Sequence, residues 1–143
     1  MPGHFVSRLM LSVLAGGQGV APLAIDLNRT HATHPLWPGH ARFHVVWQSF
    51  ASFFLAVPEV ALLCWPGAGL TFRFGVSAVL IASSLLGFLA AAAGRRLYGG
   101  SFHDPAGIRP LQIGSRKADG NALAITAGLL VLLTALLLFC AGR

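Results

Sequence analysis

The chain has 143 residues, of which 55% are hydrophobic and only 10% are charged, and its mean hydropathy is +0.72. Soluble domains carry about 25% charged residues, so this composition excludes an ordinary soluble domain and predicts an integral membrane protein. The net charge of +6 comes without a basic helix, an aromatic-rich strand or a zinc knuckle. We therefore expect no nucleic-acid binding, and we expect the positive loops to face anionic lipid in the bilayer.

Four apolar runs fill almost the whole chain, and each is long enough to cross a hydrocarbon core of roughly 30 Å. They predict an all-α fold, a polytopic membrane protein with a bundle of four transmembrane helices in a single domain, residues 1–143. The expected helices cover residues 5–25, 38–65, 72–94 and 121–141. The first run also fits a secretory signal peptide, but we expect it to remain in the protein as a helix.

Polar residues inside these runs predict two local features. Pro22 cannot donate a hydrogen bond to the carbonyl of Gln18, so a kink is expected in the first helix. Glu59 is the only carboxylate inside an apolar run, where a charged side chain costs about 2.5–3.5 kcal/mol on insertion scales. We predict a structural ion pair between Glu59 and Arg73, and the alternative is a proton-relay or substrate-binding role.

Small residues recur four positions apart in three of the expected helices. This spacing lets two helix backbones approach closely in a bilayer, so it predicts helix–helix contacts. The alternative is that alanine and glycine are simply frequent in such helices. The three sets are Ala15 and Gly19; Ser83, Gly87 and Ala91; and Ala124 and Gly128.

Two polar segments are expected on the same side of the membrane. Because the second and third helices each cross once, residues 26–44 and residues 95–119 must emerge together, and they contain five of the six histidines. They also contain most of the basic residues: Arg29, Arg42, Arg95, Arg96, Arg109, Arg116 and Lys117. The positive-inside rule places this side in the cytoplasm.

Histidines dominate the first of these segments. His40 and His44 are one helical turn apart, so both imidazoles lie on one face of the second helix and can bind one metal ion. The further candidate ligands are His31, His34, Asp26, His103 and Asp104. Imidazole and carboxylate suit Fe, Cu or Zn. A haem with two histidine ligands is disfavoured, because two side chains of one helix cannot occupy opposite axial positions. The alternatives are a polar pocket without metal and purely interfacial histidines.

Part of this segment resembles the signature of a known family. Asn28-x-Thr-His31 followed by Trp37-Pro-x-His-Ala-Arg-Phe-His44 is similar to the pattern of an uncharacterised family of small four-helix integral membrane proteins. The family favours Asn where this chain has His34. The resemblance implies the four-helix fold, and it implies His31, His40 and His44 as ligands in preference to His34. It implies no particular reaction.

The leading functional hypothesis is a metal-dependent oxidoreductase that acts on a lipophilic molecule held between the helices. In this hypothesis Asp26 and His103 join the three histidines at the metal, and the substrate-binding residues are Trp47, Gln48, Tyr98 and Asp104. The alternative is a non-enzymatic accessory or carrier protein that binds a metal ion, a quinone or a lipid headgroup, as a homo-oligomer or with a partner membrane subunit. Hydrolase and nucleotide chemistry rank lower, because the chain has no Gly-x-Ser-x-Gly or Walker A motif.

Overall fold

The computed structural model of the protein describes residues 2–102 and 107–142 and is an all-α, four-helix bundle. The helices are α1 (Pro2–Asp26), α2 (Gly39–Cys64), α3 (Leu70–Gly94) and α4 (Gly120–Ala141), with a 3-10 turn η1 (Arg95–Leu97) after α3. All four helices are long and apolar enough to cross a membrane, which confirms the predicted multi-pass membrane protein.

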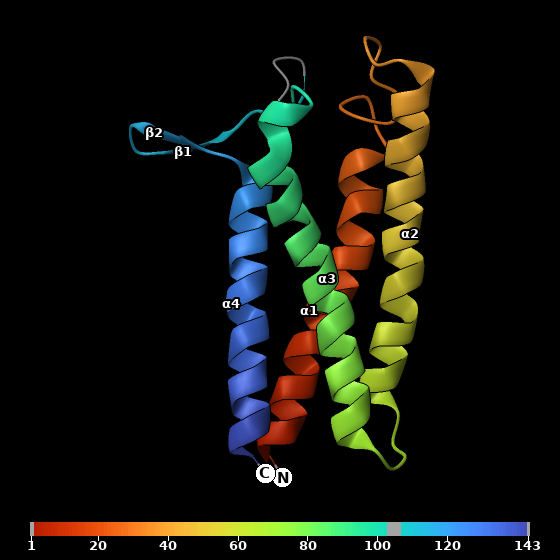
Figure 1. The fold of residues 1–143 in the computed structure, drawn as a ribbon, viewed down its shortest axis with the longest axis vertical. Helices are drawn as coiled ribbons and strands as arrows, with labels where there is room; N and C mark the ends of the chain where they lie inside the picture. Colours follow the sequence, from red (N-terminus) through yellow and green to blue (C-terminus); the bar gives the residue numbers. More distant parts are fainter. Residues whose placement is uncertain (1, 103–106, 143) are drawn as a thin grey trace.

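The helices run alternately up and down, so the connections separate into two ends (Figure 1). Both chain termini and the α2–α3 turn lie at one end, which we call the terminal end. The α1–α2 loop and the α3–α4 connection lie at the other, which we call the loop end. The prediction that residues 26–44 and 95–119 emerge together is therefore confirmed at the level of the fold.

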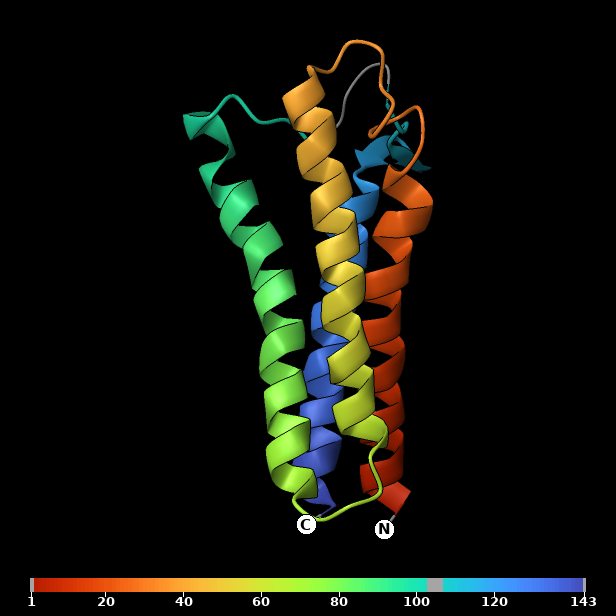
Figure 2. The ribbon, with the colours of Figure 1, turned by 90° about the vertical axis from the view of Figure 1, so that its right-hand side faces the viewer.

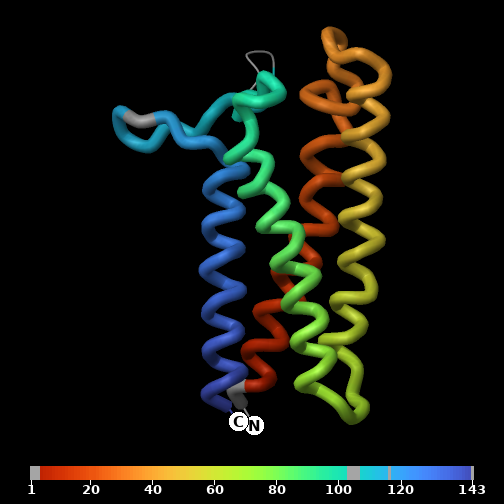
Figure 3. The backbone as a smooth tube through the Cα atoms, viewed as in Figure 1, coloured from red at the N-terminus to blue at the C-terminus, as the bar shows by residue number. Residues whose placement is uncertain are grey.

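The α3–α4 connection contains a small hairpin that the sequence analysis did not predict. Strand β1 (Leu111–Ile113) pairs antiparallel with β2 (Arg116–Ala118), and Ile113 lies opposite Arg116. Gly114 in the two-residue turn has a φ of 59°, a left-handed value that glycine adopts without strain. The hairpin extends sideways from the loop end, beyond α4 (Figure 3).

The hydrophobic core occupies mainly the terminal half of the bundle. Helix α1 packs against both α2 and α4, and α3 packs against α2 and, less extensively, against α4. Phe74 and Phe139 stack in the core with ring centroids 3.9 Å apart. Towards the loop end α3 diverges from α2 (Figure 2), and there α3 contributes no buried residue beyond Leu85. The buried core residues are Leu11, Ala15, Leu63, Phe74, Ala78, Ile81, Leu85, Leu132, Ala135 and Phe139.

One predicted set of small residues forms a close helix–helix contact, a second does so in part, and the third does not. A Cβ atom on Gly19 would lie 2.5 Å from Ala56 Cβ and 3.3 Å from Phe53 Cα, so the Ala15 and Gly19 set lets α1 and α2 approach closely. Gly128 is buried against side chains of α1 and α3, although Ala124 is exposed. Ser83, Gly87 and Ala91 are all exposed, and a Cβ atom on Gly87 would have no neighbour within 4 Å, so that prediction is wrong for a single copy of the chain.

The predicted ion pair between Glu59 and Arg73 is also wrong. No ion pair joins the two among the described residues, although Glu59 is only 2% exposed. The Arg73 guanidinium instead donates to the carbonyls of Leu62, Trp65 and Ala68. These carbonyls lie at or just beyond the C-terminal end of α2, where the backbone has no helical donor, and a cation there also complements the helix dipole.

Arg8 of α1 caps the same helix end. Its Nε donates to the carbonyl of Leu63 over 2.6 Å. Two arginines therefore donate to carbonyls at the C-terminal end of α2. These carbonyls would otherwise lack a hydrogen-bond donor, which explains why Arg73 does not turn towards Glu59. The backbone carbonyl of Glu59 accepts a hydrogen bond from Ser77 Oγ at 3.2 Å.

Candidate functional site

The first histidine group at the loop end is the pair His40 and His44 in the first turns of α2. Their Nε2 atoms are 3.1 Å apart, and the rings meet edge to face at 83° with centroids separated by 4.5 Å. The pairing follows from the helix itself, because residues four positions apart lie above one another on one face.

A separation of 3.1 Å fits two chemical situations. Two neutral imidazoles can form an N–H···N hydrogen bond at this distance. Two ligands that bind one metal ion with bonds of about 2.0–2.1 Å would have their nitrogens roughly 2.9–3.4 Å apart, for angles between a right angle and a tetrahedral one. The distance between the His40 and His44 Nε2 atoms is therefore compatible with two neighbouring ligands of one metal ion.

Aromatic side chains surround His44 on the exposed side of α2. The Phe43 and Trp47 ring centroids lie 6.0 and 5.6 Å from that of His44. Trp47 is 59% exposed, and Gln48 is exposed one turn further along the histidine face. The predicted substrate-binding residues of α2 are thus placed beside the histidine pair, on a surface that is open and largely apolar.

The second group lies in the α1–α2 loop and is organised around His31. Asn28 Nδ2 donates to the Ile25 carbonyl at 2.8 Å, which leaves Asn28 Oδ1 as an acceptor. This oxygen accepts from the backbone N–H and the hydroxyl of Thr30, at 2.8 and 2.7 Å. Because the hydroxyl has only one proton, the 2.8 Å contact between Thr30 Oγ1 and His31 Nδ1 requires His31 to donate. His31 therefore carries its proton on Nδ1, which also lies 3.6 Å from the Asp26 carboxylate.

This network has a chemical consequence for His31. In the neutral ring with its proton on Nδ1, Nε2 presents a lone pair that can bind a metal or accept a proton. A hydrogen-bonded Nδ1–H is the usual arrangement behind a metal-binding or basic Nε2. The Asn-x-Thr-His element thus fixes the tautomer of the His31 imidazole. The sequence signal for this arrangement is the Asn-x-Thr pattern, because an Asn side chain commonly accepts a hydrogen bond from the backbone two residues later.

His34 has the opposite tautomer. Its Nδ1 accepts a hydrogen bond from the Leu36 backbone N–H at 3.2 Å, so the neutral ring carries its proton on Nε2. The side chain is 1% exposed, and within residues 2–102 and 107–142 its Nε2 has no hydrogen-bond partner. This tautomer places the proton on Nε2 and uses the Nδ1 lone pair, so neither ring nitrogen of His34 presents a free lone pair to a metal.

Arg42 and Trp37 join this loop to α2. Arg42 Nε donates to the Trp37 carbonyl at 2.9 Å, and Arg42 Nη2 donates to the Pro35 carbonyl at 3.3 Å. The Trp37 ring lies 5.4 Å from both the His31 and the His34 rings, at angles of 86° and 32°. Sequence reasoning treated Arg42 only as a positive charge, and its role as a clamp on loop carbonyls was missed.

The complete predicted ligand set is not assembled in the described part of the chain. No group of three or more His, Cys, Asp or Glu side chains is placed there to hold one metal ion. The structure brings together His40 with His44 and, separately, His31 with Asp26. The predicted residues His103 and Asp104 lie outside the described residues.

Tyr98 lies at the other side of the loop end, after η1. Its hydroxyl donates to the Ala91 carbonyl at 2.7 Å, and it lines a small pocket of about 160 Å³ beside the end of α3. In the same pocket the Arg95 guanidinium lies 4.9 Å from the centroid of the Phe102 ring. None of the contacts in the described ranges connects Tyr98 with the histidines.

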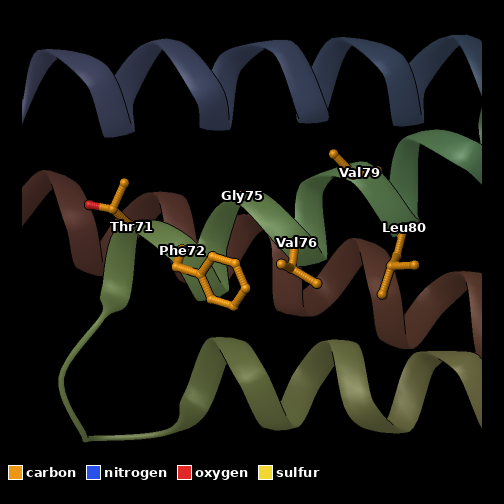
Figure 4. Close-up of a pocket in the computed structure, with 6 residues that line it drawn as sticks. All are labelled: Thr71, Phe72, Gly75, Val76, Val79 and Leu80. Atoms are coloured by element: carbon orange, nitrogen blue, oxygen red, sulfur yellow. The ribbon is translucent and has the colours of Figure 1, made fainter.

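A groove lies away from all these groups, on the outer face of α3. It has a volume of about 420 Å³, and Figure 4 shows its lining: Thr71, Phe72, Gly75, Val76, Val79 and Leu80. Its lining has no titratable side chain. In a bilayer such a groove accommodates lipid chains.

Comparisons with known protein families, curated proteins and solved structures found no match. The family resemblance therefore stays a prediction that rests on the Asn28–His44 pattern. Function must be argued from the geometry of the two histidine groups.

Proposed function

We propose that the protein is a membrane-embedded metal-binding protein, with His40 and His44 as the first two ligands and a redox reaction on a lipophilic molecule as its activity. The observation that carries this proposal is the 3.1 Å separation of the two Nε2 atoms. Iron or copper suits the proposed redox chemistry, whereas zinc would restrict the site to structural or hydrolytic roles.

The remaining ligands would come from the neighbouring segments. His31, with its Nδ1–H held by Thr30 and Asp26, presents an Nε2 lone pair suited to a metal. Asp26 and His103 are the other predicted ligands. A third ligand would convert the histidine pair into a site of the three-ligand type that catalytic metal centres use, with a position left open for substrate.

The surroundings of the pair support a lipophilic substrate. Phe43 and Trp47 flank His44 and are exposed, and α3 diverges from α2 at this end of the bundle (Figure 2). A molecule dissolved in the bilayer can therefore approach the pair along an apolar surface. We place the loop end in the cytoplasm, because most of the basic residues belong to the connections there.

A second candidate function is a metal carrier without catalysis. It is favoured by the exposure of both imidazoles and by the lack of a third described group beside them. An ion held by two exposed ligands exchanges readily, which suits transfer to a partner protein. The two functions differ in how firmly the ion is retained.

The test is a metal titration of the detergent-purified protein. Cobalt(II) and copper(II) absorption would be followed for the unmodified protein and for His40→Ala, His44→Ala and the double variant, with His4→Ala as the control from the terminal end. We expect one ion per chain, and we expect each single variant to bind at least about tenfold more weakly. The double variant should be little worse than either single variant, because ligands to one ion are not additive.

Equal affinity in all five proteins would reject the metal site. Rapid loss of the ion during dialysis would favour the carrier function. Retention of iron or copper through purification would favour the oxidoreductase.

A further inference from the structure

We propose that the α1–α2 loop contains a second binding site, in which His34 Nε2–H donates a hydrogen bond to a carbonyl oxygen of a lipophilic molecule. His34 is not one of the proposed metal ligands, so this inference does not rest on the proposed function. It rests on three observations: His34 is buried, its tautomer places the proton on Nε2, and this Nε2–H has no described hydrogen-bond partner.

The protonation of His34 is determined by its backbone contact. Nδ1 accepts from Leu36 N–H at 3.2 Å, and a ring nitrogen that accepts a hydrogen bond cannot carry a proton. The single proton of the neutral ring is therefore on Nε2. With the side chain 1% exposed, this donor is removed from water.

An unpaired buried donor is costly, and here the surrounding loop is otherwise well paired. Leaving such a group without a partner costs about 1–3 kcal/mol. Hydrogen-bond partners are present for Asn28, Thr30 and His31 of the same loop and for Arg42 of α2, whereas His34 Nε2 has none in the described ranges. Such a donor is satisfied either by an ordered water or by an acceptor on another molecule, and the position of the loop between the ends of two membrane spans favours the second.

The chemistry of the site selects the class of ligand. A neutral N–H donor requires an acceptor oxygen, and it disfavours a metal ion. Arg42 of α2, whose guanidinium contacts the loop, already donates to the carbonyls of Pro35 and Trp37, so this guanidinium does not call for an anion. The Trp37 ring, 5.4 Å from that of His34, adds an aromatic neighbour. A neutral carbonyl on a lipophilic molecule fits this environment, and a quinone or a lipid ester supplies one.

Two other polar atoms are also buried without a described partner, and they differ in position. His4 Nε2 belongs to a ring stacked on Phe139, with centroids 4.6 Å apart, at the terminal end. Gln18 Nε2 lies within α1. His34 lies in a loop that adjoins the ends of two membrane spans, where amphipathic molecules gather. His4 therefore provides a matched control.

Two substitutions separate the donor from the loop structure. His34→Asn retains a side-chain acceptor that can reach the Leu36 N–H and removes the donor at the position of Nε2. His34→Gln retains a donor close to the position of Nε2. The background would be Trp47→Phe with Trp65→Phe, which leaves Trp37 as the only tryptophan.

Quenching of Trp37 fluorescence by a short-chain ubiquinone in lipid nanodiscs would then report occupancy. We expect saturable quenching, about tenfold weaker in His34→Asn, close to the parent in His34→Gln and unchanged in His4→Ala. Equal affinity of the parent and His34→Asn, or equal weakening by both His34 substitutions, would overturn a quinone as the ligand of this site.

A second measurement uses the unmodified side chain, so it does not depend on how the variants fold. The ¹⁵N and ¹H signals of His34 Nε2–H would be recorded in nanodiscs of ester-linked phosphatidylcholine and of its ether-linked analogue, which has no ester carbonyl. A shift between the two lipids assigns the site to a lipid ester, and a shift only after ubiquinone is added assigns it to a quinone. An Nε2–H signal that is the same in all samples would contradict the proposal.

Discussion

At the residue scale, hydrogen-bond stoichiometry assigns opposite tautomers to two histidines that are three positions apart. His31 donates from Nδ1, because the Thr30 proton is used by Asn28, and His34 accepts at Nδ1 from the backbone. The same type of side chain therefore offers a lone pair at one position and a donor at the other. The two positions consequently have different chemistry, which their residue type alone does not reveal.

Substitution of Thr30 tests this assignment. Thr30→Val removes the hydroxyl that accepts from His31 Nδ1–H, so the share of His31 with its proton on Nε2 should rise. The measurement is the ¹⁵N spectrum of histidine-labelled protein. Thr33→Val is the control, because Thr33 is exposed and its side chain has no described hydrogen bond. A His31 spectrum unchanged by Thr30→Val would show that Thr30 does not hold the tautomer.

At the element scale, backbone requirements decided several outcomes that side-chain chemistry alone had predicted differently. Arg73 was expected to pair with Glu59, but the C-terminal carbonyls of α2 recruit both Arg73 and Arg8. Helix α1 continues through Pro22 to Asp26, and a kink within it at Pro22 stays a prediction. The close contact of α1 with α2 at Gly19 was predictable from the sequence. Small residues four positions apart in a membrane helix allow a neighbouring helix backbone to approach closely.

Enlarging Gly19 should therefore weaken the bundle. Gly19→Val would place methyl groups against Ala56 and the backbone of Phe53, and overpacking of this kind costs about 1–3 kcal/mol. Gly17→Val is the matched control, since Gly17 lies in the same helix and has no neighbour within 4 Å. The measurement is the thermal midpoint in detergent. Similar midpoints for the two variants would contradict a close α1–α2 contact.

At the scale of the whole molecule, the number of spans, their limits to within a few residues and the gathering of two polar connections at one end were all predictable from the sequence. Hydropathy determines the spans, and an even number of crossings between the connections determines their common end. The hairpin was not predictable, because three-residue strands give almost no periodic signal. The distribution of the histidines into two groups also required three-dimensional geometry, since spacing along the chain relates His40 only to His44.

The topology gives a prediction for the intact protein in its membrane. With Cys64 and Cys140 replaced by alanine, single cysteines at Ala32 and Ser115 should react with an impermeant thiol reagent from the same side, and a cysteine at Gly67 from the opposite side. The reason is that α2 and α3 each cross once between these positions. Labelling of intact vesicles and of opened vesicles would measure it, and opposite sides for positions 32 and 115 would contradict the fold.

The most direct test of the account is to count the imidazoles bound to the metal in the whole protein. X-ray absorption of copper-loaded protein in nanodiscs separates imidazole nitrogens, through their ring scattering, from water and carboxylate oxygens. The 3.1 Å separation of the His40 and His44 Nε2 atoms predicts at least two imidazoles per copper ion, with one fewer in either His40→Ala or His44→Ala. A spectrum without bound imidazole, or one that stays the same in the double variant, would contradict a metal site at the loop end.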